Sequence, residues 1–139
     1  MRWFDGGFRV RGQVSMPGRR GRVRTPAGWF GVLELVGSTL TLRMRPSWLW
    51  ARLANGGGRL VVHADEEAVI FPVRPSTFRE RKRAGTEGFG SHGGLGVQPE
   101  GRPASYIYVM YFAIEGPRIL DAIEDAGFQV SWEERPFEF

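Results

Sequence analysis

The stretch WFGVLELVGSTLTLRMR, residues 29–45, predicts two β-strands that are joined by a tight turn. The Gly37-Ser38 pair suits a two-residue hairpin turn, because glycine accepts the positive φ that the first central position needs. In residues 39–44 apolar side chains alternate with polar or basic ones, which is typical of a strand with one buried face. Pro46 ends the second strand, since proline has no amide hydrogen for a sheet ladder. This hairpin indicates a β-rich fold.

Further strands are expected on both sides of the hairpin. Residues 8–16 alternate strictly between apolar and polar side chains and predict a strand at a sheet edge. Residues 59–73 contain two apolar runs and predict two strands with a bend between them. Residues 105–114 are apolar on both faces, which predicts the most buried strand. The glycine-rich residues 85–96 indicate a loop.

The period of the pattern changes near the C-terminus, where residues 116–128 predict one amphipathic helix. Pro117 suits the first helical position, and three apolar residues at helical spacing form a stripe. Acidic side chains occupy the opposite face, and Gly127 suits the position that follows the last turn. A short strand is expected in residues 128–132. The chain is therefore predicted to be mainly β with one C-terminal α-helix.

Length and composition favour one domain. The 139 residues include 42% hydrophobic residues, too many for a disordered chain, and the 20 glycines and 9 prolines imply many turns. The chain has no cysteine, so disulfides and thiolate metal sites are excluded. The N-terminus lacks the apolar segment of a secretory signal, and the longest apolar run, residues 106–114, is shorter than the ~20 residues of a membrane-spanning helix. A cytoplasmic location is therefore expected.

Charge is distributed unevenly along the chain. Residues 1–24 contain seven arginines and one acidic residue, whereas residues 115–139 contain two arginines and seven acidic residues. The two ends of the chain are therefore expected to attract each other, either within one molecule or between two copies.

The order of the expected elements, six or seven short antiparallel strands and then one helix, is similar to that of a pleckstrin-homology-like domain. The stretches WFGVLELVGSTLTLRMR, LVVHADEEAVIFPV, YIYVMYF and RILDAIEDAGFQVSWEE resemble a group of small bacterial proteins of this class over residues 26–134. The resemblance implies a bent antiparallel β-sandwich or barrel that is capped by the helix. It also implies binding or scaffolding rather than catalysis. Residues 1–25 are then an N-terminal strand and arginine-rich arm, and residues 135–139 are a tail.

Arg43 and Arg45 form an Arg-x-Arg pair in what the resemblance implies is the second strand. Many eukaryotic pleckstrin-homology domains hold phosphoinositides with such a pair and with a basic residue near the end of the first strand. That further basic residue is missing here, and Arg43 lies about five residues beyond the turn, roughly 17 Å along a strand. The pair is therefore expected at the wrong end of the hairpin for this kind of site.

Trp48, Trp50 and Arg52 follow this pair and allow two interpretations. Tryptophan beside arginine is typical of a protein that rests on a bilayer surface, with the ring among headgroups and the guanidinium on phosphates. Tryptophan is also often buried in cores and interfaces, because it buries a large area. We favour packing, either at the end of the sandwich or in a dimer contact.

The densest basic run is RERKR, residues 79–83, which adjoins the glycine-rich loop. Its cationic side chains could contact phosphates of lipid or nucleic acid, although such a run is more often a solvated turn. The candidate ligand-binding residues of this run are Arg79, Arg81, Lys82 and Arg83.

No residue is assigned a catalytic or metal-binding role. GFGSHG, residues 88–93, matches the G-x-G-x-x-G pattern, but it lacks the preceding strand and the following helix of a dinucleotide site. His63 and His92 have no neighbours at metal-ligand spacing, so a hydrogen-bonded or exposed histidine is expected. The aromatic residues of 106–112 are interpreted as core rather than as a base-stacking surface. No cofactor or small-molecule substrate is identified.

The sequence favours a non-enzymatic binding domain. Its expected partner is another protein or a second copy, which it meets through strand edges or through the turn that contains Trp48 and Trp50. The first alternative is peripheral binding to an anionic membrane through the three arginines of residues 43–52 and through residues 79–83. The weaker alternative is binding of nucleic acid by the basic residues 1–24.

Overall fold

The prediction of a mainly β fold with a helix near the C-terminus is confirmed by the computed structural model. The described residues are 2–18, 21–25, 30–75, 94–101, 106–109, 116–133 and 135–137. The strands are β1 (Arg2–Phe4), β2 (Gly7–Gly18), β3 (Gly21–Arg24), β4 (Gly31–Val36), β5 (Thr39–Met44), β6 (Arg59–His63), β7 (Ala68–Pro75), β8 (Gly94–Pro99), β9 (Tyr106–Val109), β10 (Gln129–Val130) and β11 (Arg135–Phe137). The helices are α1 (Ser47–Trp50), the short 3-10 helix η1 (Asn55–Gly58) and α3 (Gly116–Asp125).

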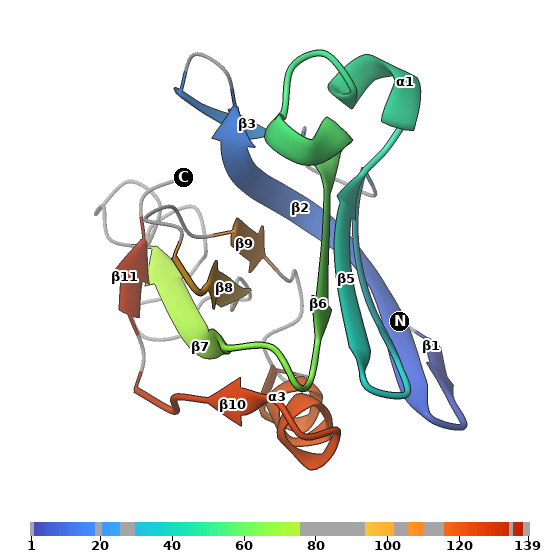
Figure 1. The fold of residues 1–139 in the computed structure, drawn as a ribbon, viewed down its shortest axis with the longest axis vertical. Coiled ribbons are helices and arrows are strands. Elements are labelled where there is room, and N and C mark those ends of the chain that lie inside the picture. The colour runs from blue at the N-terminus through green and yellow to red at the C-terminus, as the bar shows by residue number, and fades with distance from the viewer. Residues whose placement is uncertain are drawn as a thin grey trace.

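The long strand β2 connects two sheets (Figure 1). Its first half pairs with β4, which continues to β5 and β6, and its second half pairs with β9, which continues to β8 and β7. These ladders are antiparallel, whereas the short strands β10 and β11 run parallel to β7. The prediction that residues 8–16 form an edge strand is wrong. A strand with one covered face shows the same alternation of apolar and polar residues at the centre of a sheet as at its edge. The alternation therefore could not show which of these positions the strand occupies.

Two glycines face each other where β2 passes from one sheet to the other. Gly12 pairs with Gly31, and the next residue, Gln13, already pairs with β9. A Cβ on Gly31 would lie 2.8 Å from the carbonyl oxygen of Gly12 and 2.9 Å from the amide nitrogen of Val14. The two backbones therefore approach more closely than any residue other than glycine at position 31 would allow. Such close approach is common where a strand bends.

The hairpin of β4 and β5 is formed as predicted. Val36 pairs with Thr39, so Gly37 and Ser38 are the two residues of the turn. Gly37 has a φ of 59°, and no residue other than glycine has a positive φ in the described structure. The turn therefore has its positive φ at the first central position, which suits the twist of the two strands.

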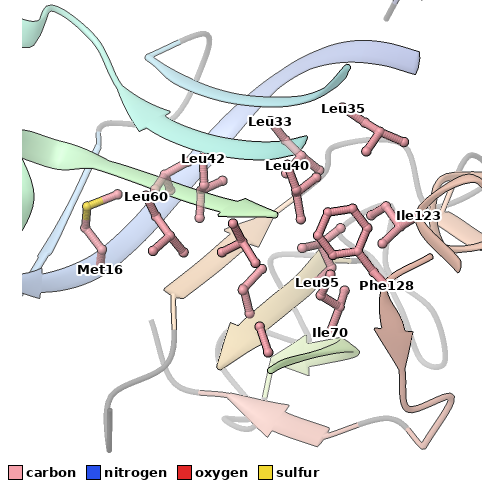
Figure 2. Packing of buried hydrophobic residues seen from close by; sticks show 14 of the residues in the cluster. Met16, Leu33, Leu35, Leu40, Leu42, Leu60, Ile70, Leu95, Ile123 and Phe128 are labelled. Atoms are coloured by element: carbon pink, nitrogen blue, oxygen red, sulfur yellow. The ribbon is translucent and has the colours of Figure 1, made fainter. Parts of the chain in front are cut away.

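The core lies between the two sheets and is shown from close by in Figure 2. Inward-facing residues alternate with outward-facing ones along β5 and β6, as expected for strands with one covered face. The side chains labelled in Figure 2 come from both sheets and from the C-terminal segment: Met16, Leu33, Leu35, Leu40, Leu42, Leu60, Ile70, Leu95, Ile123 and Phe128.

Helix α3 lies at one end of the two sheets (Figure 1). Ile119 and Ile123 are fully buried. The helix ends with the backbone hydrogen bonds that are common where a glycine follows the last turn. The amide of Gly127 donates to Glu124 at 2.9 Å, and the amide of Phe128 donates to Ile123 at 3.3 Å. Phe128 then returns to the core, where it is 4% exposed. The predicted helix and its cap are both confirmed.

The described strands do not close into a barrel. Among the described residues, β5 is the only strand that pairs with β6, and no ladder joins β6 to β7. β7 follows β6 in the chain but turns away from it into the second sheet (Figure 1). One corner between the two sheets therefore stays open.

Several predictions fall partly or wholly outside the described residues. The strand predicted for residues 105–114 is described only as β9, and the burial of its side chains is outside the description. Most of the glycine-rich residues 85–96 also lie outside the described residues. The last three of them, residues 94–96, form the beginning of β8. The division of the chain at residues 25 and 134 stays a prediction.

Candidate binding surfaces

The chain forms one exposed helical turn after β5, at the end of the sheets opposite α3 (Figure 1). Pro46 precedes α1 with an extended backbone (φ −73°, ψ 145°) and follows the last residues of β5, as predicted. We call five exposed side chains of this region the α1 surface: Arg45, Trp48, Leu49, Arg52 and Leu53.

Trp50 holds α1 against the core. Its side chain is 7% exposed, and its indole Nε1 donates a hydrogen bond to the carbonyl oxygen of Arg45 at 3.1 Å. Ala54 is also buried, and its amide donates to the carbonyl oxygen of Trp50 at 3.0 Å. Gly58 approaches so closely that a Cβ on it would lie 2.9 Å from Trp50 Cβ. The interpretation as packing therefore fits Trp50.

Trp48 does not pack at the end of the sandwich, because its side chain is 75% exposed, and a dimer contact through it stays a prediction. Leu49 and Leu53 are 41% and 49% exposed, so three large apolar side chains face solvent close together in the chain. The two arginines of the α1 surface are exposed as well. Residues 35–64 contain no acidic residue. This end of the molecule is therefore both apolar and cationic.

Leu49 and Leu53 were not among the candidate binding residues predicted from the sequence. They are four residues apart, which places side chains on the same face of a helical turn. Trp50 and Ala54 repeat this spacing on the buried face. The spacing was therefore a usable signal, but a single turn is too short for a search for helical periodicity to detect.

Arg43 lies apart from the α1 surface, on the outer face of β5. Its cross-strand neighbours are Val32 and Arg59, at the end of the hairpin away from the turn, as predicted. The side chain is half-buried, and its Nε has no hydrogen-bond partner among the described residues. Like charges directly opposite each other weaken a sheet, so the pairing of Arg43 with Arg59 is an unfavourable element of this face.

The other predicted basic regions are described only in part. The four candidate residues of the basic run 79–83 lie outside the described residues. The N-terminal basic segment forms β1, β2 and β3, and Arg9 Nε in β2 donates to Glu34 Oε2 in β4 at 2.6 Å. Near the other terminus, the Arg118 guanidinium lies over the Trp3 ring at 4.1 Å from its centre. The two ends of the chain thus meet through a cation–π contact.

A second candidate surface is a hollow at the open corner between β6 and β7. A cavity of about 410 Å³ is lined by β6, by the turn that leads to β7 and by the end of β8. A neighbouring cavity of about 430 Å³ shares Glu67, Pro99 and Glu100 with the first. We call the two cavities together the acidic groove. Its carboxylates are Asp65, Glu66, Glu67 and Glu100.

Two carboxylates of the acidic groove interact with each other. A side-chain hydrogen bond with Glu67 and the negative charge of Glu67 raise the pKa of Glu100 above its usual range. The backbone fixes this pair, because the amide of Glu100 donates to the carbonyl oxygen of Glu67 at 2.8 Å. A cation beside the pair would favour the charged form of both groups. No pattern in the sequence predicts that Glu100 lies beside Glu67.

His63 lies at the end of β6 and is exposed. Its Nδ1 is 3.1 Å from the hydroxyl oxygen of Thr39, so it is hydrogen-bonded as expected. His92 lies outside the described residues. Within the described ranges, no group of three or more histidine, cysteine, aspartate or glutamate side chains is placed to hold a metal ion.

Comparison with family models, curated proteins and solved structures finds no match for the chain. None of the described helices is long and apolar enough to cross a bilayer. A proposal for the function therefore rests on the two surfaces themselves, and the cytoplasmic location stays a prediction.

Proposed function

We propose that the chain is a non-enzymatic binding domain of the pleckstrin-homology-like class, and that its α1 surface docks onto another protein chain. The topology supports the class. Two mainly antiparallel sheets enclose one core, and α3 covers one end of them, as in the sandwich that the sequence resemblance implies, although the strand β2 that joins the sheets lies outside residues 26–134. Such folds carry many functions, so the surface has to identify the activity.

The observation that carries the proposal is the exposure of Trp48. A tryptophan that is 75% exposed on a short helical turn, beside two exposed leucines, leaves apolar area in water without any gain for the fold. Tryptophan, tyrosine and arginine are the residues that most often dominate the energy of protein interfaces. The flanking Arg45 and Arg52 then form the polar rim that such interfaces usually have.

A second copy of the chain is the partner that can be tested first. The exposed face of α3 carries Asp121, Glu124 and Asp125, and it lies at the end of the molecule opposite the α1 surface (Figure 1). These two regions cannot meet within one molecule. They have opposite charge, so two copies can bring them together.

Analytical ultracentrifugation over a range of protein concentrations tests this pairing. We expect the wild-type chain to associate as its concentration rises, and Trp48→Ala to remain monomeric. Val61→Ala is the control, because Val61 is an exposed apolar residue (36%) outside both the α1 surface and α3. A wild-type chain that stays monomeric at every concentration would exclude the second copy. Equal loss of association in both variants would exclude the α1 surface as the contact.

Peripheral binding to an anionic membrane is the second candidate function. It is favoured by the absence of acidic residues in residues 35–64 around Trp48. Tryptophan and leucine would enter the headgroup region, and the two arginines of the α1 surface would contact lipid phosphates. Co-sedimentation with neutral and with anionic vesicles, each at low and physiological salt, separates the two functions. Salt-sensitive binding to anionic vesicles alone, lost in Trp48→Ala, would favour the membrane.

A further inference from the structure

Strand β6 has one edge without a strand partner in the described part of the chain. Its pairing with β5 uses the backbone amides and carbonyls of one edge only. The backbone amides and carbonyls of the other edge face the open corner between the sheets. An unpaired edge of this kind is a template on which another extended segment can add as a strand.

The acidic groove runs along this edge. Leu60, Val61 and Val62 are consecutive residues of β6, and all three line one of the two cavities. Side chains of a strand alternate between its two faces, and here Leu60 and Val62 are buried while Val61 is exposed. Residues from both faces of β6 therefore line the same cavity, as expected if the cavity lies along the edge of the strand. The groove therefore gives access to the backbone of β6.

The opposite wall of the groove is negatively charged. It is formed by residues 65–67 of the turn after β6 and by Glu100 at the end of β8. All four carboxylate residues are exposed. Within the described residues, none of them forms an ion pair with a basic side chain. The second cavity extends this wall past Gln98 and Gln129, beside β10.

We propose that the acidic groove binds an extended, basic peptide segment of a partner protein, which adds to β6 as a further strand. Backbone hydrogen bonds to β6 hold the segment, and lysine or arginine side chains at alternate positions contact the carboxylates of the opposite wall. The five residues of β6 span roughly 17 Å, which matches a segment of about five or six residues. This site is separate from the α1 surface and does not depend on the function proposed for it.

A synthetic peptide with the sequence Lys-Val-Lys-Val-Lys-Val and blocked ends is the probe. It is titrated into the ¹⁵N-labelled full chain, and the amide signals are followed by nuclear magnetic resonance. We expect the largest shifts in residues 59–63 and 65–67 and at Glu100. The same peptide with glutamate in place of lysine is expected to cause no shifts, because its charge opposes that of the groove.

Backbone methylation tests strand addition directly. In an extended peptide, alternate amides point toward the same neighbour. Methylating the amides of the lysines in one peptide, and those of the valines in another, therefore blocks opposite edges without a change of charge. We expect one of these two peptides to lose binding and the other to keep it. Equal binding by both would overturn strand addition.

Charge reversal tests the acidic wall. We expect Glu67→Lys to weaken the binding of the unmethylated peptide by at least about tenfold. Asp121→Lys is the matched control, because Asp121 is an exposed acid on α3, outside the groove, and its reversal should leave the affinity unchanged. Equal weakening in both variants, shifts centred outside the groove, or no shifts at the highest peptide concentration would each overturn the proposal.

Discussion

Replacing Trp50 with alanine will destabilise the fold far more than the same change at Trp48, although the two tryptophans are separated by one residue. Trp50 is 7% exposed and is hydrogen-bonded to the carbonyl oxygen of Arg45, whereas Trp48 is 75% exposed. Truncation of a buried tryptophan to alanine costs about 3–5 kcal/mol, because apolar burial is lost and a cavity remains. Truncation of an exposed side chain changes stability by about 0.5 kcal/mol or less.

Urea unfolding followed by far-ultraviolet circular dichroism measures this difference, because the five tryptophans of the chain make fluorescence hard to assign. The free energy of unfolding should fall with urea concentration at the same slope in the two variants and the wild type. Differences between their unfolding midpoints then report differences in stability. A loss of 3 kcal/mol also lowers the thermal midpoint by about 10 °C for a domain of this length. Trp50→Phe removes the indole donor and part of the ring but keeps an aromatic side chain, and it should cost about 1–2 kcal/mol.

Equal losses of stability at the two positions, or a larger loss at Trp48, would refute the placement of α1. A larger loss at Trp48 would mean that Trp48 is the packed side chain and Trp50 the exposed one, and equal losses would mean that Trp48 contributes to packing as much as Trp50 does. The α1 surface would then lose the residue on which the proposed docking depends. The experiment therefore also tests the structural basis of the proposed function, before any partner is known.

Three further changes test other parts of the structure. Gly31→Ala should destabilise the fold by about 2 kcal/mol or more, because the new Cβ would lie 2.8 Å from the carbonyl oxygen of Gly12, as thermal unfolding can show. Ile123→Ala should cost about 2–5 kcal/mol, since this α3 side chain is fully buried, and a loss below 1 kcal/mol in urea unfolding would contradict that placement. The raised pKa of Glu100 means that the folded chain binds its proton more tightly than the unfolded chain, so stability contributed by this group is lost as pH rises above 4.5. Glu100→Gln should reduce this dependence of stability on pH, because it keeps a hydrogen-bond donor for Glu67 and removes the repulsion between the two carboxylates. The pairing would be contradicted if the urea midpoint of this variant varied between acidic and neutral pH as it does in the wild type.

The sequence was sufficient for the elements that local chemistry determines. The Gly37-Ser38 turn, the end of β5 at Pro46 and the cap of α3 at Gly127 each follow from the backbone needs of one or two residues. The alternation of apolar residues in β5 and the helical spacing in α3 also follow from burial on one face. These features could be predicted because the residues that determine them are adjacent in the chain.

The sequence was insufficient where distant segments meet. The alternation in residues 8–16 is the same for an edge strand and for the shared strand β2, because it reports only which face is covered. In the same way, Trp48 and Trp50 have identical side chains, and only the direction of one helical turn decides which of them is buried. The acidic groove brings Glu67 beside Glu100, and no local pattern joins these two residues.

The pairing of β2 also constrains how the chain folds during synthesis. β2 is made early, yet Gln13 in its second half pairs with Val109 in β9, which is made much later. Pairs of residues so far apart in the chain form slowly, because a long loop must close before they meet. Until the ribosome has released β9, half of β2 presents an open edge to other nascent chains, and a truncated product would keep that edge permanently.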